Sequence, residues 1–157
     1  MMMMFTLLLA GGIGAEAPKG KVLFVYDEVK SPPEAFPGYF RDSLASEGVP
    51  FDEAVAADMN TKDLSSYDRI VVYGMVQAFN MKSPLRDWLK TKPDLGGKKV
   101  SLFVTANRWY LKNLYGQLTT LLKKGNAEVI DAVSMATRDM DTPTKVLAVK
   151  DHVARLK

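Results

Sequence analysis

The fold of this chain follows from residues 67–89, Tyr67-Asp-Arg-Ile-Val-Val-Tyr-Gly-Met-Val-Gln-Ala-Phe-Asn-Met-Lys-Ser-Pro-Leu-Arg-Asp-Trp-Leu89. The apolar run Ile70–Tyr73 has no polar alternation, which is typical of a strand that helices cover on both faces. Gly74 ends this run. Ser83 can accept a hydrogen bond from a free N–H of the first helical turn, and Pro84 has no N–H to leave unpaired there, so the pair predicts a helix start. The stretch therefore predicts a central strand, a loop at its carboxyl end and a return helix. Ligands of open parallel sheets bind at such loops.

Strand-like and helix-like segments alternate through the rest of the chain. Apolar runs predict further strands in Lys21–Tyr26, Val49–Val55, Val100–Thr105 and Glu128–Val133. Helical patterns occupy residues 37–48, 83–91, 111–124 and 142–156. Val49–Val55 contains a proline and two acidic residues, as suits an edge strand, which need not donate every N–H and must discourage stray pairing. The alternation predicts an α/β fold of three layers, a parallel sheet with helices on both faces.

Composition and charge exclude several kinds of function. The 157 residues suit one domain, and the net charge of +3 comes from well-mixed signs. Because no basic stripe alternates with aromatic residues, we expect no nucleic-acid partner. The chain has no cysteine, which excludes disulfides, thiolate metal sites and cysteine nucleophiles. The one histidine, His152, is expected on the surface of the last helix, and methionines near the predicted loops favour packing over a copper site. No metal site and no catalytic residue is assigned.

The first residues have the pattern of a secretion signal rather than of a folded element. Met1–Ala15 has no charged side chain, and Phe5–Ala10 is a compact apolar block. Ala15-Glu16-Ala17 has the small-x-small form of a signal-peptidase site, although no Lys or Arg precedes the apolar block. We expect a signal peptide over residues 1–17 and an exported domain, periplasmic or secreted, over residues 18–157. An uncleaved anchor and a different start among the four methionines are the alternatives, and no other membrane span is expected.

Four phrases of the sequence resemble the flavodoxin-like family, and the resemblance covers residues 21–157. The phrases are Ser66-Tyr-Asp-Arg-Ile-Val-Val-Tyr-Gly74, Ser83-Pro-Leu-Arg-Asp-Trp-Leu-Lys90, Gly96-Gly-Lys-Lys-Val-Ser-Leu-Phe-Val-Thr105 and Lys123-Lys-Gly-Asn-Ala-Glu-Val-Ile130. The first phrase is also similar to the branch that contains the quinone-linked protoporphyrinogen oxidases. The resemblance implies a five-stranded parallel sheet with the strand order 2-1-3-4-5. The edge-like composition of Val49–Val55 agrees with this order.

The resemblance also implies where a cofactor would bind. Members of the family hold FMN with three loops, at the carboxyl ends of strands one, three and four. The cofactor-binding residues implied here are Lys30, Ser31, Gly74, Gln77, Phe79, Asn80, Thr105, Asn107, Arg108, Trp109 and Tyr110. Aromatic residues of the third loop stack on the isoalloxazine ring in the family. The alternative is that Trp109 and Tyr110 simply begin a helix and pack against Leu114.

The first of these loops departs from the family pattern. Residues 27–34 contain no Thr-Gly pair, and Asp27 and Glu28 place two carboxylates where the phosphate dianion would bind. Two prolines also remove backbone donors from this loop. Only Lys30 and Ser31 are left to contact a phosphate.

Two classes of function follow from these features. The first is an exported FMN-binding protein for electron transfer or quinone-linked redox chemistry, with a flavin and a redox protein as partners. The second is a flavin-free binding module that kept the fold and lost the phosphate-binding loop. Fold analogy does not decide between them, because this scaffold hosts many functions. Neither class fixes an oligomeric state or an enzymatic activity.

Overall fold

The computed structural model describes residues 20–27, 36–75 and 83–156 of the chain. The elements in these residues are β1 (Val22–Tyr26), α1 (Phe36–Ser46), β2 (Phe51–Val55), the 3₁₀-helix η1 (Ala56–Thr61), β3 (Arg69–Met75), α2 (Pro84–Lys90), β4 (Lys99–Ala106), α3 (Arg108–Lys124), β5 (Glu128–Ala136) and α4 (Thr142–Ala154). The strands form one parallel sheet in the order β2-β1-β3-β4-β5, as the sequence predicts. The expected signal peptide, residues 1–17, lies outside the described residues.

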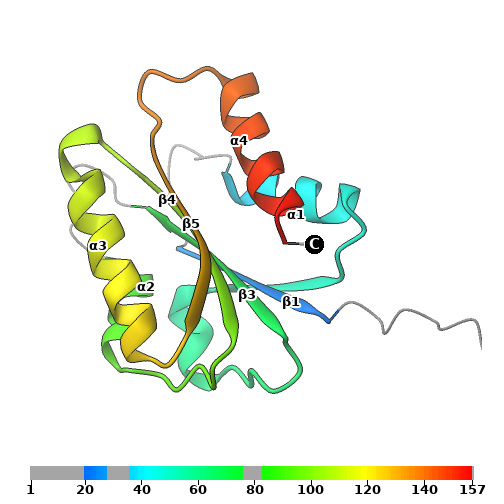
Figure 1. Ribbon diagram of the computed structural model, residues 1–157, viewed down its shortest axis with the longest axis vertical. Helices are drawn as coiled ribbons and strands as arrows, with labels where there is room; N and C mark the ends of the chain where they lie inside the picture. Colours follow the sequence, from blue (N-terminus) through cyan, green and yellow to red (C-terminus); the bar gives the residue numbers. More distant parts are fainter. Residues whose placement is uncertain (1–19, 28–35, 76–82, 157) are drawn as a thin grey trace, which may run out of the picture.

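Helices cover both faces of the sheet, with α2 and α3 on one side and α1 and α4 on the other (Figure 1). The two faces divide the central strand β3 between them. Ile70 and Val72 pack towards α2 and α3, whereas Val71 and Tyr73 pack towards α1 and α4. None of these four side chains is more than 1% exposed, which confirms β3 as the buried centre of the sheet.

β3 is longer than the sequence predicts. The expected end at Gly74 is wrong, because the strand continues through Gly74 to Met75 and pairs there with β4. A Cβ atom on residue 74 would lie 2.6 Å from Cδ1 of Leu118 and 3.2 Å from Cδ2 of Leu85. The glycine therefore makes room for α3 and α2 to pack against the strand, since real Cβ contacts are not this short.

His152 is not on the surface, as the sequence analysis expects, but fully buried at 0% exposure. It lies three residues after the buried Val149 and so shares the inward face of α4. Its ring contacts the rings of Phe40 and Phe103 edge-to-face, with centroid separations of 6.1 and 5.3 Å. The imidazole therefore packs in this layer as an aromatic ring.

The rest of the architecture matches the sequence patterns closely. β2 is an edge strand, and the segment after it forms the short helix η1 instead of a full crossover helix. The Ser83 hydroxyl accepts a hydrogen bond from the Arg86 N–H, and Pro84 occupies the first turn of α2. No helix in the described part of the chain is long and apolar enough to cross a membrane.

Candidate functional site

The candidate site is the edge of the sheet where β1, β3 and β4 end. Because the three strands are parallel and adjacent, their carboxyl ends lie at one edge, which is where open parallel sheets bind ligands. The loops that follow β1 and β3 include residues 28–35 and 76–82, which lie outside the described residues. The structure therefore does not place five of the predicted contacts: Lys30, Ser31, Gln77, Phe79 and Asn80.

Asp27, the first residue after β1, has a different role from the one expected. Its carboxylate accepts hydrogen bonds from the Leu85 N–H at 2.7 Å and from the Ser83 hydroxyl at 2.9 Å. The side chain is only 4% exposed. Burial raises the pKa of Asp27 to about 6, although both hydrogen bonds and the nearby Arg86 oppose this rise. The expectation that this carboxylate faces a ligand phosphate is wrong, because it binds the start of α2 instead.

The third loop is much shorter than predicted. Thr105 still belongs to β4, and residues 108–110 form the first turn of α3, so Asn107 alone connects the two elements. Thr105 is 2% exposed, and its hydroxyl lies 2.8 Å from that of Tyr73. The hydroxyl of Thr105 therefore makes a buried contact within the domain and is not exposed at the carboxyl edge of the sheet.

Trp109 and Tyr110 begin α3 and differ in their surroundings. Trp109 is 71% exposed, whereas tryptophan side chains are highly buried on average. Tyr110 is half-buried against the core beneath α3. The two rings contact each other edge-to-face at a centroid separation of 5.5 Å. The alternative that both aromatic residues simply begin a helix and pack against the core therefore fits Tyr110 alone. The ring of Trp109 is exposed to solvent.

Arg86 is a residue of this edge that the sequence analysis missed. It lies in the first turn of α2 and is 7% exposed. Its Nη1 donates to the Tyr110 hydroxyl at 3.0 Å and to the side-chain oxygen of Gln117 at 3.3 Å. A charged residue in a short helix is usually solvated, so only the packing of α2 against α3 reveals this buried position.

The described candidates thus fall into two groups. Asn107, Arg108 and Trp109 are at least partly exposed at the carboxyl edge, and the Asn107 side chain makes no capping hydrogen bond to α3. Gly74, Thr105 and Tyr110 contact other parts of the protein.

The structure contains no cluster of three or more metal-ligating His, Asp or Glu side chains within residues 20–27, 36–75 and 83–156.

Two hollows in the described surface lie away from this edge. One, of about 500 Å³, lies between η1 and the turn after α2, with Trp88 among its lining residues. The other, of about 430 Å³, lies at the opposite end of the sheet, where Arg69 and Lys99 begin β3 and β4. No residue predicted to bind a cofactor lines either hollow, so neither changes the location of the candidate site.

Solved structures are similar to this chain over most of its length. Oxidised flavodoxin 2 from Bacillus cereus has a TM-score of 0.66 and 18% identity, over 88% of this chain and 100% of the flavodoxin. The flavodoxin of Fusobacterium nucleatum bound to flavin mononucleotide has a TM-score of 0.64 and 12% identity, over 88% and 97% of the two chains. A mutant flavo di-iron protein from Thermotoga maritima has a TM-score of 0.62 and 18% identity, over 88% of this chain and 36% of that one.

These similarities establish the class of fold. Neither a protein-family model nor a curated protein sequence matches the chain. The strand order and the matched structures nevertheless show that the chain has the flavodoxin-like fold, which confirms the prediction from its sequence phrases.

Proposed function

We propose that this protein binds a flavin at the carboxyl edge of its sheet and uses it for electron transfer. The observation that carries the proposal is the 71% exposed ring of Trp109, at the start of the helix that follows β4. Covering a large exposed aromatic ring with a planar ligand is favourable, and this ring lies beside the edge where a ligand is expected. The flavin mononucleotide in the Fusobacterium nucleatum flavodoxin supports FMN as the form of flavin, because the two chains share a fold.

The described residues fit the ring of a flavin better than its phosphate. Trp109 offers an open aromatic face, and Asn107 and Arg108 offer hydrogen-bond donors beside it. Asp27 does not oppose a bound anion as strongly as its sequence position suggests, because its carboxylate is bound to Ser83 and Leu85. The flavin would supply the electron-transfer chemistry, and these side chains would hold and orient it. Quinone-linked chemistry is a narrower form of this proposal.

The proposal predicts an unusual preference between two flavins. After Asp27, the first loop contains two prolines, the two acidic residues Glu28 and Glu34 and no Thr-Gly pair, so ring contacts must supply most of the binding free energy. Riboflavin, which lacks the phosphate, should then bind nearly as tightly as FMN. A flavodoxin with an intact phosphate-binding loop would instead strongly prefer FMN.

Fluorescence-quenching titrations of riboflavin and FMN test the proposal in one experiment. Trp109→Ala should weaken binding of both flavins by about 10- to 100-fold, which corresponds to losing a stacked aromatic worth about 1–3 kcal/mol. Leu147→Ala is the matched control, because Leu147 is also a large exposed apolar residue (58%) but lies on α4. FMN binding far tighter than riboflavin would show that the first loop does recognise phosphate.

A flavin-free binding module is the second candidate function. It is favoured by the use of Gly74, Thr105 and Tyr110 within the domain, which leaves few of the described candidates for a cofactor. In this case Trp109 would contact a macromolecular partner, as exposed aromatic residues often do. Well-folded wild-type protein that binds neither flavin would support this module and contradict the flavin proposal.

A further inference from the structure

Arg86 joins α2 to α3 through two hydrogen bonds from a single nitrogen. Nη1 carries two hydrogens, and it donates to the Tyr110 hydroxyl at 3.0 Å and to Oε1 of Gln117 at 3.3 Å. Tyr110 and Gln117 are two helical turns apart on α3 and therefore project from the same face. The guanidinium group bridges them from a buried position, since Arg86 is 7% exposed. This charge-assisted hydrogen bond is partly buried and holds the Tyr110 hydroxyl at one point.

Tyr110 in turn contacts the exposed ring of Trp109. The ring planes meet at 61°, with the centroids 5.5 Å apart, which is a favourable edge-to-face arrangement. Within residues 20–27, 36–75 and 83–156, Tyr110 is the only aromatic residue whose ring contacts that of Trp109. An exposed side chain without such a contact changes rotamer in picoseconds to nanoseconds. The orientation of the Trp109 ring therefore depends on where Tyr110 is held.

We propose that Arg86 is a positioning residue, which fixes Tyr110 and thereby holds the indole ring of Trp109 ready to cover a planar ligand. The nature of that ligand rests on the proposed flavin function, whereas the ordering of the ring does not. A ring that is ordered before binding loses less conformational entropy when the ligand arrives. This effect should improve affinity by about two- to tenfold.

The ordering of the ring can be measured without any ligand. The chain has two tryptophans, so protein labelled with 5-fluorotryptophan gives two ¹⁹F resonances, which Trp109→Phe assigns. Trp88 is 3% exposed and serves as a reference within the same molecule. Tyr110→Phe removes only the hydroxyl that Arg86 binds. Tyr115→Phe is the matched control, because Tyr115 is on the same helix and its hydroxyl makes no hydrogen bond to the described residues.

We expect Tyr110→Phe and Arg86→Met to increase the nanosecond motion of the Trp109 resonance and to leave that of Trp88 unchanged. Tyr115→Phe should change neither resonance. Unchanged relaxation of Trp109 in both Tyr110→Phe and Arg86→Met would overturn the proposal. Equal loosening of Trp88 and Trp109 would also overturn it, because the bond would then support the whole α2–α3 interface and not the ring.

Riboflavin titrations separate this inference from the proposed function. If wild-type protein binds riboflavin, Tyr110→Phe should weaken binding by about two- to tenfold, less than Trp109→Ala does. Unchanged riboflavin affinity in Tyr110→Phe, with a loosened Trp109 ring, would overturn the role of this ordering in binding. If wild-type protein binds no flavin, the proposed function fails, and the ¹⁹F relaxation alone decides whether Arg86 positions the ring.

Discussion

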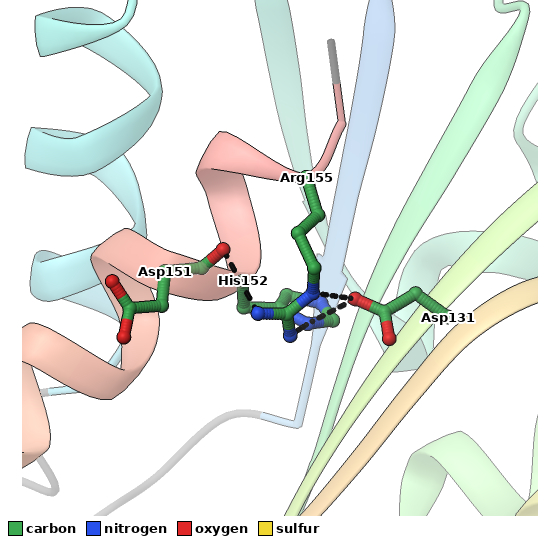
Figure 2. Close-up of polar contacts among 4 residues, drawn as sticks. All are labelled: Asp131, Asp151, His152 and Arg155. Carbon is green, nitrogen blue, oxygen red and sulfur yellow. Dashed lines mark hydrogen bonds and ion pairs between the residues drawn. The ribbon is translucent and has the colours of Figure 1, made fainter.

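Nδ1 of His152 lies 3.1 Å from Oδ2 of Asp131, and this contact joins α4 to the edge strand β5 (Figure 2). Arg155 donates from Nε to the same carboxylate oxygen at 2.8 Å. His152 is the buried member of this group, whereas Arg155 is exposed at the end of α4. Burial lowers the pKa of His152 to about 4, with Asp131 opposing the change and Arg155 adding to it.

The first prediction concerns the pH dependence that His152 gives to stability. Its pKa is about 4 in the folded protein and near 6.5 when unfolded, so the unfolded chain binds more protons between these values. The unfolding free energy of wild type, relative to that of His152→Gln, should therefore decrease as the pH falls from 6.5 to 4. The expected decrease is on the order of 1–3 kcal/mol. Urea unfolding at several pH values measures this difference. A constant difference would show that the buried imidazole titrates normally.

The second prediction concerns Asp27 and has the opposite sign. The pKa of Asp27 is about 6 in the folded protein, against 3.8 for an ordinary aspartate, so the folded chain binds more protons between these values. The unfolding free energy of wild type relative to Asp27→Asn should therefore decrease as the pH rises from 4 to 6, by on the order of 1–3 kcal/mol. Above pH 6, Asp27→Asn should be at least as stable as wild type, because its amide oxygen still accepts from the Leu85 N–H. An unfolding free energy difference that does not change between pH 4 and pH 6 would contradict this prediction.

The third prediction concerns Gly74. Gly74→Ala would place a methyl group 2.6 Å from Cδ1 of Leu118 in a closely packed layer. We expect a loss of about 1–3 kcal/mol in unfolding free energy, as for other overpacked cores. Gly116→Ala is the control, because its added Cβ has no atom within 4 Å apart from its chain neighbours and the backbone of its own helix. Replacing an exposed helical glycine by alanine should stabilise the protein by about 1 kcal/mol.

A double variant makes the packing argument specific. Leu118→Val removes one carbon from the side chain that faces Gly74, so it should recover part of the stability lost in Gly74→Ala. Additive losses in the double variant would contradict the proposed contact, because residues that share a packing conflict are coupled.

The fourth prediction concerns the N-terminus and rests on the sequence alone. Cleavage after Ala15 or Ala17 would leave a mature chain that begins at Glu16 or Pro18. Mass spectrometry of the protein isolated from its native host measures this directly. An intact Met1 on protein recovered from the cytoplasm would contradict the predicted export.

Much of the fold was predictable, because its signals are local. The unbroken apolar run at Ile70 identifies a central strand, and Ser83-Pro84 marks the start of α2 within one residue. Pro50, which directly precedes β2, and the acidic Asp52 and Glu53 within β2 similarly identify an edge strand. Each of these features depends on residues within a single element, which a sequence presents directly.

The site was less predictable, because its contacts join distant elements. In the sequence, Gly74 predicts the end of a strand. Its actual role, to make room for Leu118, depends on packing between distant elements. The position of His152 follows the inward period of α4, but its partner Asp131 lies on another element, the strand β5, which that period does not indicate. The bond between Asp27 and Ser83 likewise joins segments that sequence spacing does not relate.

The bond between Asp27 and the start of α2 also bears on protein engineering. It fixes one end of residues 28–35, and the buried Phe36, whose ring stacks on Tyr73 at 5.4 Å, fixes the other. A segment between two firmly held ends can be exchanged as a cassette without disturbing the sheet. If the domain binds a flavin as proposed, a Thr-Gly-containing phosphate loop transplanted between Asp27 and Phe36 should make it prefer FMN over riboflavin. If the proposed flavin binding holds, phosphate recognition could be installed in this domain separately from ring recognition.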